Sequence, residues 1–284
     1  MSDFIPEHAF AGVSGLSDGH VHTSNSFDSD EPVAAYCERG LELGLSGFTV
    51  TDHCEIVASG VSPHWSFETM ARSRSDARAA AAEYAGRLEV LSGVELGQPD
   101  FDPDIAKRVL DADWDCVLAS VHYLRDGEDF YYINFRDRTR DAHAIYESYL
   151  REVLLMAERS DYDSLAHMTY PLRYIVRRDR VELDETRYSA LYDEILTAVA
   201  QRGKALELNT KISREGDDLT LPEPSMLSRF RELGGRYVTI GSDAHRAAVF
   251  AGGLGGGAER IKAAGFEGVT RFVGRKPVVT PFAD

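Results

Sequence analysis

Six short segments of this 284-residue chain each carry, at or near their end, a side chain that commonly binds metal ions. Most are rich in β-branched residues and are typical of strand ends. They are DGHVHT (18–23), TVTDH (49–53), LSGVELG (91–97), LASVHY (118–123), SLAHM (164–168) and TIGSDAH (239–245). This many imidazole and carboxylate groups exceeds the needs of one zinc ion, so they predict a polynuclear centre and metal-assisted hydrolysis.

Segments with helical spacing alternate with these apolar runs, which is typical of parallel βαβ units. The expected helices cover residues 31–44, 66–86, 139–159, 184–203 and 223–235, and the Gly-rich stretch 251–260 is expected to be a loop that leads into a final helix. About seven strand–helix units favour a closed barrel over an open sheet. In such barrels the site lies at the carboxyl ends of the strands, where the ligand-type residues are found here.

Charge and composition exclude several classes of protein. The formal net charge of −16 argues against a nucleic-acid partner but permits a small phosphorylated substrate, because bound cations set the local field. Cys37, Cys54 and Cys116 form no CxxC pair, which favours a reducing cytoplasm. The segment MSDFIPEHAF has no signal-peptide pattern, and the absence of an apolar run of roughly 20 residues predicts no membrane span. The oligomeric state is left open.

The pair His20 and His22 is spaced so that both rings face one side of an extended strand, and one metal ion can bind both. An HxH pair alone is weak evidence, but the further ligand-type segments strengthen it, since buried His and carboxylate groups need partners or metals. Asp18, Asp52 and Glu55 lie beside these residues. They are expected either to orient imidazole rings or to cap loops.

The segments DGHVHT, TDH, GVEL, SVHY, HMTYP and GSDAH, in this order, resemble the polymerase-and-histidinol-phosphatase (PHP) superfamily. SVHYL, HMTYPLRY and LELNT are more similar to its histidinol-phosphatase branch. The resemblance implies an α/β fold, a distorted (β/α)7 TIM-like barrel with the metal site at the C-terminal ends of the strands, and a single PHP phosphoesterase domain over 1–284. It also implies three divalent metal ions, for which mixed ligands suit Mn, Fe or Zn.

The resemblance also assigns ligands. The first metal would be bound by His20, His22, Glu95 and Asp243, and Glu95 would bridge to a second metal completed by His122 and His167. The third metal would be bound by Asp28, His53 and His245. Relatives often have His in the position of Asp28.

The implied activity is that of a phosphatase for a small phosphate monoester, L-histidinol phosphate above all, as in histidine biosynthesis. A metal-bridging hydroxide would attack phosphorus, and Asp243 or His245 would handle the leaving-group proton. Substrate contacts are expected from the side chains that follow two strands and from one loop, namely Arg173, Arg214, Asn209 and His64. The loop with His64 and Trp65 is a possible lid, and Tyr131 and Tyr132 lie in an insertion that either walls the site or packs on the barrel.

Two alternatives stay open at this point. The same metal centre would also suit a sugar phosphate or a nucleotide, because the motifs favour histidinol phosphate only moderately. A non-catalytic metal-binding module is the other alternative, as PHP domains attached to polymerases can be, but all nine ligand positions are filled.

Overall fold

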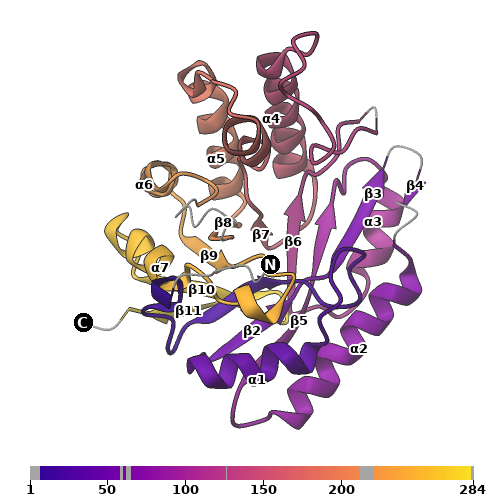
Figure 1. Ribbon diagram of the computed structural model, residues 1–284, viewed down its shortest axis with the longest axis vertical. Helices are drawn as coiled ribbons and strands as arrows, with labels where there is room; N and C mark the ends of the chain where they lie inside the picture. Colours follow the sequence, from indigo (N-terminus) through magenta and orange to yellow (C-terminus); the bar gives the residue numbers. More distant parts are fainter. Residues whose placement is uncertain (1–6, 58–59, 62–64, 126, 212–219, 283–284) are drawn as a thin grey trace.

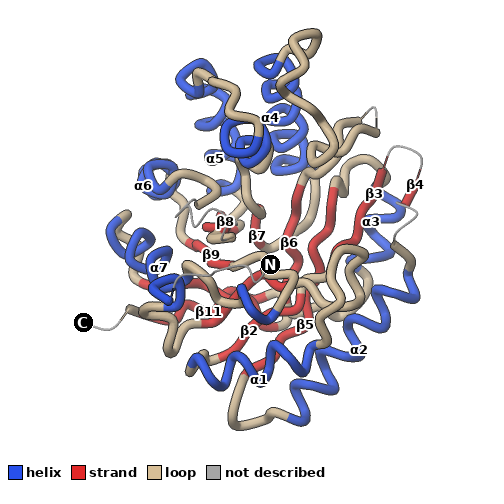
Figure 2. Tube along the Cα trace, in the orientation of Figure 1, coloured by secondary structure: helices blue, strands red, loops and turns tan. Residues whose placement is uncertain are grey.

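The computed structural model describes residues 7–57, 60–61, 65–125, 127–211 and 220–282. Its centre is a parallel sheet that closes on itself, with the helices around the outside of the strands (Figures 1 and 2). In sheet order the strands are β1 (Ser17–Val21), β2 (Gly47–Val50), β5 (Glu89–Gly97), β6 (Cys116–Ser120), β7 (Ser164–Leu165), β8 (Ala205–Asn209) and β9 (Tyr237–Gly241). Two short strands extend the sheet beside β5: β3 (His53–Val57) pairs with it in parallel, and β4 (Gly60–Val61) pairs with β3 in antiparallel fashion.

The barrel closes between its first and last strands. A parallel bridge joins Val21 to Ala244, and the backbone N–H of His22 donates to the Ala244 carbonyl at 2.8 Å. The fully buried Tyr36 reinforces this seam, because its hydroxyl donates to the carbonyls of both His22 (2.8 Å) and Ala244 (3.2 Å). The fold class expected from the sequence, a distorted seven-stranded α/β barrel, is therefore confirmed.

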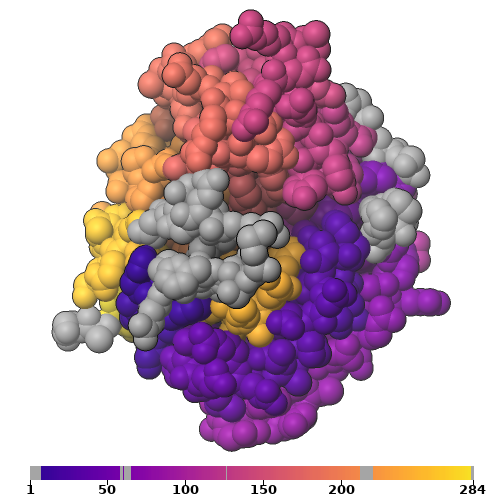
Figure 3. All heavy atoms as spheres, in the orientation of Figure 1, coloured from indigo at the N-terminus to yellow at the C-terminus, as the bar shows by residue number. Residues whose placement is uncertain are grey.

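Each strand of the barrel is followed by helical structure. The α-helices are α1 (Val33–Leu43), α2 (Phe67–Glu83), α3 (Pro103–Leu110), α4 (Ala142–Arg159), α5 (Ser189–Gln201), α6 (Pro224–Glu232) and α7 (Leu254–Ala263). Shorter turns are η1 (Glu7–Phe10), the π-helical η2 (Arg173–Arg178), η3 (Glu185–Tyr188) and η4 (Ala247–Val249). In the space-filling view, α1 and α2 lie on one side of the molecule and α4 and α5 on the other (Figure 3).

Local sequence signals set several helix ends. The Ser66 hydroxyl accepts a hydrogen bond from the Thr69 N–H and caps α2, and the Asp141 carboxylate caps α4 in the same way. Gly44 ends α1 in the left-handed region at φ 69°, which a residue without Cβ adopts at little cost. Among the described residues, no helix is both long enough and apolar enough to cross a membrane.

A hairpin closes the end of the barrel opposite the carboxyl ends of the strands. Strands β10 (Gly268–Val273) and β11 (Lys276–Pro281) pair in antiparallel fashion. Phe272 packs against Cys116, Ala205 and Tyr237, which are the first residues of β6, β8 and β9. In the turn, the Gly274 N–H donates to the Asp115 carboxylate at 3.0 Å. The sequence reading did not predict this hairpin or α3.

Candidate metal centre

The barrel brings all nine predicted ligand residues to the C-terminal end of its strands. Each lies near the end of a strand or in the segment that follows one, and most are buried. They are His20, His22, Asp28, His53, Glu95, His122, His167, Asp243 and His245. The strand ends that the sequence scatters over more than 200 residues therefore form one cluster.

Glu95 lies at the middle of this cluster, and its two oxygens face different imidazoles. Oε1 is 2.8 Å from His167 Nε2 and 3.3 Å from His122 Nε2. Oε2 is 3.5 Å from the Nε2 atoms of both His20 and His22. A carboxylate placed in this way has the geometry of a bridge between two metal positions.

The donor atoms fit metal ions. Five groups of three ligand-type residues have donor atoms within 4.8 Å of one another in the described chain. Three of them consist of predicted ligands alone, namely Glu95–His122–His167, His20–His22–Glu95 and His22–His53–His245, and the other two include Glu207 or Glu55. Glu95 Oε2 and His53 Nδ1 are 2.9 Å apart and buried, yet neither has a well-formed hydrogen bond within the described residues. Buried polar atoms normally have partners, so cations bound by these two side chains are a simple way to satisfy them.

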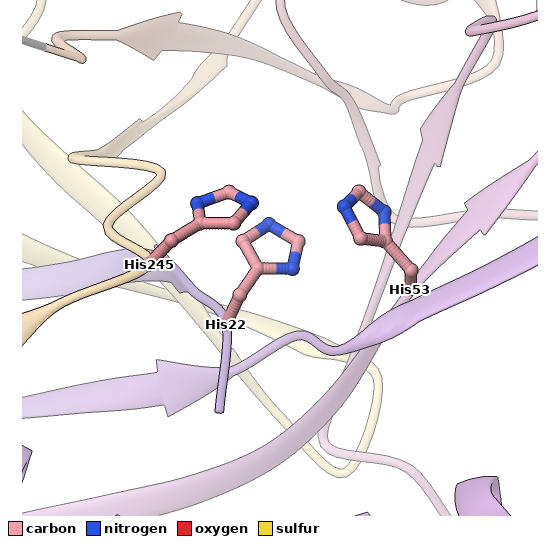
Figure 4. A group of neighbouring side chains, drawn as sticks. All are labelled: His22, His53 and His245. Atoms are coloured by element: carbon pink, nitrogen blue, oxygen red, sulfur yellow. The ribbon is translucent and has the colours of Figure 1, made fainter. Parts of the chain in front are cut away.

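The third group turns its rings toward one another (Figure 4). Asp28 completes it, with Oδ2 3.0 Å from His245 Nε2 and 3.5 Å from His53 Nε2. The Nδ1 atom of His245 lies 3.0 Å from the Asp243 carbonyl, so an Nδ1–H that donates there leaves Nε2 free to bind a metal.

Two buried glutamates orient the imidazoles from outside the cluster. Glu207 Oε1 is 2.6 Å from His20 Nδ1, and Glu55 Oε1 is 2.7 Å from His122 Nδ1. Each carboxylate selects the tautomer whose Nε2 lone pair points into the cluster. Gln98 holds Glu55 in turn, because its amide N–H donates to Glu55 Oε2 at 3.0 Å.

Of the three acidic neighbours considered from the sequence, only Glu55 contacts an imidazole in this way. Asp52 accepts from the hydroxyls of Thr23, Ser26 and Ser73, and so fixes the loop after β1 to α2. Asp18 accepts from the backbone N–H groups of His20, Ser242 and Ala251 and from the Ser242 hydroxyl. Asp18 and Asp52 therefore fix the conformation of loops and do not orient an imidazole ring.

The electrostatics of the cluster keep its central carboxylates ionised. Burial alone would lower the pKa of His20, His53 and His122, but the adjacent carboxylates raise it above its usual value, so metal binding at these rings displaces protons. Burial alone would raise the pKa of Glu95, but the adjacent imidazoles of His122, His20 and His53 lower it well below its usual range. Burial raises the pKa of Glu55 as well, and the charge of His122 outweighs that effect and lowers the pKa to about 2. Burial and the charges of His245 and His53 hold the pKa of His22 well below its usual value, so its ring stays neutral.

Backbone strain is found at two of the predicted ligand positions. His167 has φ 23° and Asp243 has φ 50°, both in the left-handed region that residues with a side chain rarely adopt. Each follows the end of a barrel strand and turns its side chain back over the opening. Strain of this kind costs about 1–3 kcal/mol per residue and is concentrated at functional sites.

Two of the four predicted substrate residues are placed at the cluster. Arg173 Nη1 is 3.3 Å from Asp243 Oδ2, and its Nη2 donates to Asn209 Oδ1 at 3.2 Å. His64 and Arg214 lie outside the described residues. Lys211, which the sequence reading missed, lies beside Asp243 with Nζ 2.9 Å from Oδ1. It lies two residues beyond Asn209, the last residue of β8, and a basic residue just after a strand end was a signal for it.

A row of aromatic rings leads from the cluster to the surface. The Tyr170 ring centre is 4.9 Å from that of His122 and 5.0 Å from that of His167. Tyr174 is 5.1 Å further on, and Tyr131 is 5.9 Å beyond Tyr174. Tyr131 is 57% exposed, so the expected insertion does supply an aromatic residue on the His122 side of the site.

A parallel α/β barrel with a buried His and carboxylate cluster at the C-terminal ends of its strands defines a divalent-metal-binding barrel protein. A family model for the PHP domain matches residues 18–211. A probable histidinol-phosphatase from Deinococcus radiodurans is 30% identical over 249 residues, which cover 82% of this chain and 88% of the relative. The chain belongs to the PHP domain family.

Other comparisons agree with this family and with its histidinol-phosphatase branch. The histidinol-phosphatase of Lactococcus lactis is 28% identical over 274 residues, covering 91% of this chain and 95% of the relative. A crystal structure of the Lactococcus lactis histidinol phosphate phosphatase, complexed with zinc, L-histidinol and phosphate, superposes with a TM-score of 0.78. That match has 25% sequence identity and covers 93% of this chain and 98% of the other.

Proposed function

We propose that this protein is a metal-dependent phosphatase that hydrolyses L-histidinol phosphate to L-histidinol and phosphate in histidine biosynthesis. The observation that carries the proposal is the position of Glu95 between two sets of imidazoles, with Arg173 on the adjacent Asp243. A cluster that binds cations and has a partly exposed Arg at its edge is suited to a phosphate monoester. The relatives are histidinol phosphatases, and the Lactococcus lactis structure holds zinc, histidinol and phosphate.

The ligand assignment is part of the proposal. His20, His22, Glu95 and Asp243 hold one ion; Glu95, His122 and His167 hold a second; Asp28, His53 and His245 hold a third. Mn, Fe and Zn all suit these donors. When bound, such ions stabilise negative charge on phosphoryl oxygens and lower the pKa of coordinated water. In this proposal residues 1–284 form a single phosphoesterase domain.

The protein's own groups position the substrate. Arg173 donates to phosphoryl oxygens, and Asn209 holds its guanidinium in place through the bond from Nη2. Asp243 and His245 handle protons. Burial would raise the pKa of Asp243, but Lys211 and the neighbouring imidazoles lower it well below its usual range. Asp243 is therefore ionised and can accept a proton.

The aromatic row distinguishes between substrates. The row begins with Tyr170 beside His122 and His167, continues through Tyr174 and ends at the exposed Tyr131. The Arg173 guanidinium lies 5.4 Å from the centre of the Tyr170 ring. In histidinol phosphate a short chain links an imidazole ring to the phosphate. The phosphate would pair with the Arg173 guanidinium, and the imidazole ring would pack against the adjacent tyrosine rings. A sugar phosphate has no flat ring for such a surface.

The test is phosphate release from L-histidinol phosphate beside a panel of sugar phosphates and nucleotides, with the metal content of the protein counted by elemental analysis. We expect a clear preference for histidinol phosphate in protein that carries about three ions per chain, as the proposed ligand assignment requires. Preference for another ester would keep the metal centre and reject the substrate. Full metal loading without turnover on any ester would support a binding module instead.

A further inference from the structure

We propose that Asp129 binds the ammonium group of the substrate and so selects a phosphate ester that carries a primary amine. This inference rests on the proposed function and deepens it. L-Histidinol phosphate has three groups to recognise, namely a phosphate, an imidazole ring and a protonated amine. Arg173 and the metal cluster suit the phosphate, and the tyrosine rings suit the imidazole. A carboxylate is the natural partner of the third group.

Backbone contacts place Asp129 beside the metal cluster. It pairs with Tyr123 in an antiparallel bridge, and the N–H of the next residue, Phe130, donates to the His122 carbonyl at 3.2 Å. His122 is the predicted metal ligand that follows β6. The insertion after β6 therefore returns to the strand end that it left and brings Asp129 next to the site.

Asp129 lies along the aromatic row. The row begins beside His122, which Phe130 contacts, and it ends at Tyr131, whose backbone N–H donates to Asp129 Oδ1 at 2.7 Å. Burial raises the pKa of Tyr170 and of Tyr174, and the negative charge of Asp129 adds to the rise at both. Charges act on a pKa mainly at short range, so the carboxylate is close to the rings on which an imidazole would pack.

Asp129 is the acidic residue of this region that still needs a counter-charge. Glu128 pairs with Arg140 at 2.7 Å, and Asp179 pairs with Arg178 at 2.9 Å. Among the Lys, Arg and His side chains that the structure describes, none forms an ion pair with the partly buried Asp129. Burial accordingly raises its pKa. A carboxylate withdrawn from water without a cation is costly, and a bound ammonium would remove that cost.

The missing cation is expected to be organic and not a metal ion. Within the described chain, Asp129 belongs to none of the groups whose donor atoms lie close enough to share a metal. An ammonium group needs only one such carboxylate. In histidinol phosphate the carbon that carries the amine also carries the arms that lead to the phosphate and to the imidazole. Three separate partners for these arms would select the L enantiomer over the D enantiomer.

The experiment compares Asp129→Asn with the control Asp137→Asn in the metal-loaded protein. Asparagine keeps an oxygen for the Tyr131 N–H and removes only the charge. Asp137 is exposed in the same insertion, and its Oδ1 likewise accepts from the backbone N–H two residues later, that of Thr139, at 3.0 Å.

Two pairs of esters, each with and without the amine, serve as probes: L-histidinol phosphate with its des-amino analogue, and O-phosphoethanolamine with ethyl phosphate. Kinetics give KM and kcat for each ester. Calorimetry with L-histidinol and des-amino histidinol makes the same comparison without turnover. Elemental analysis and thermal unfolding report metal content and folding.

We expect the wild type to prefer the amine-bearing member of each pair about 10-fold or more, chiefly through KM, as for other hydrogen bonds between charged groups. Asp129→Asn should abolish most of this preference with unchanged metal content and unchanged kcat for the des-amino esters. Asp137→Asn should keep it. A purely structural role would impair both members of a pair equally, and that result would overturn the proposal.

A preference retained in folded Asp129→Asn, or absent from the wild type, would overturn it as well. The proposed function can fail separately. If histidinol phosphate is a poor substrate but the preference for O-phosphoethanolamine over ethyl phosphate depends on Asp129, the substrate is wrong and this inference stands. If histidinol phosphate is the best substrate in both variants, the function stands and Asp129 does not bind the amine.

Discussion

Replacing Glu207 with glutamine tests how the barrel orients its imidazoles. Glu207 is 1% exposed, and its two oxygens have different partners. Oε1 is 2.6 Å from His20 Nδ1, and Oε2 accepts from the His167 backbone N–H at 2.8 Å. Glutamine keeps the shape but replaces one oxygen with an NH2 group. In either orientation of the amide, that group faces an N–H and one hydrogen bond is lost.

The size of the effect follows from the tautomer of His20. When the NH2 group faces its ring, the proton has to move from Nδ1 to Nε2, and Nε2 is the atom that faces Glu95. That nitrogen then has no lone pair for a metal. Loss of such an orienting partner typically weakens metal binding ~10–100-fold, and this factor corresponds to ~1.4–2.7 kcal/mol. The lost buried hydrogen bond lowers the free energy of unfolding of the metal-free protein by about 1–3 kcal/mol.

The assay is a competition titration with a chromogenic chelator, with urea unfolding of the metal-free protein as a second measurement. Glu259→Gln, an identical change at an exposed position on α7, is the control and should behave like the wild type. Wild-type metal affinity in a folded Glu207→Gln protein would refute the orienting role. A loss of stability with no loss of metal affinity would reduce Glu207 to a structural residue.

Three further changes test other parts of the molecule. Glu95→Gln should leave at least one metal position empty and lower the rate of phosphate release by several orders of magnitude; elemental analysis and a phosphate assay check this, and full activity would contradict the bridge. Phe272→Ala should lower the free energy of unfolding, measured in urea, by about 3–5 kcal/mol without changing KM. An unchanged urea midpoint of unfolding would show that the packing of Phe272 does not stabilise the barrel. Tyr131→Ala should raise KM for histidinol phosphate about 2- to 10-fold more than KM for an aliphatic phosphate ester. Its control is Tyr132→Ala, and an equal rise for both esters would argue against an aromatic contact.

The clustering of the predicted ligand residues could be foreseen because parallel strands end at the same edge of a sheet. Residues such as His53, His122 and Asp243 needed only a strand assignment to be placed together. Glu207 was not predicted, since a glutamate within ALELN looks the same whether it faces the barrel interior or solvent. Only barrel closure, which brings β1 beside β9, places His20 next to it.

Strand geometry also explains why neighbours in sequence differ in role. Asp52 precedes His53, and successive side chains of an extended segment point in opposite directions. Asp52 therefore reaches Ser73 on α2, while His53 faces Glu95. Glu55, two residues after His53, returns to the same side and contacts His122. The hairpin β10–β11 was missed although its sequence carries a signal: two runs rich in β-branched residues flank the two-residue turn Gly274–Arg275, in which both residues have positive φ.

The hairpin at the base of the barrel also sets an order of events during synthesis. The Asp115 carboxylate, just before β6, cannot accept its hydrogen bond from the Gly274 N–H until Gly274 has been synthesised, 159 residues later. At the usual elongation rate of about 5–20 residues per second, that interval lasts roughly 10–30 s. Cys116 is not covered by Phe272 during this interval, and Ala205 is not covered from its own synthesis until Phe272 is added. A ribosome that stalls shortly before residue 272 would thus carry a chain in which all seven barrel strands have been synthesised, but the end of the barrel that Phe272 covers is still exposed.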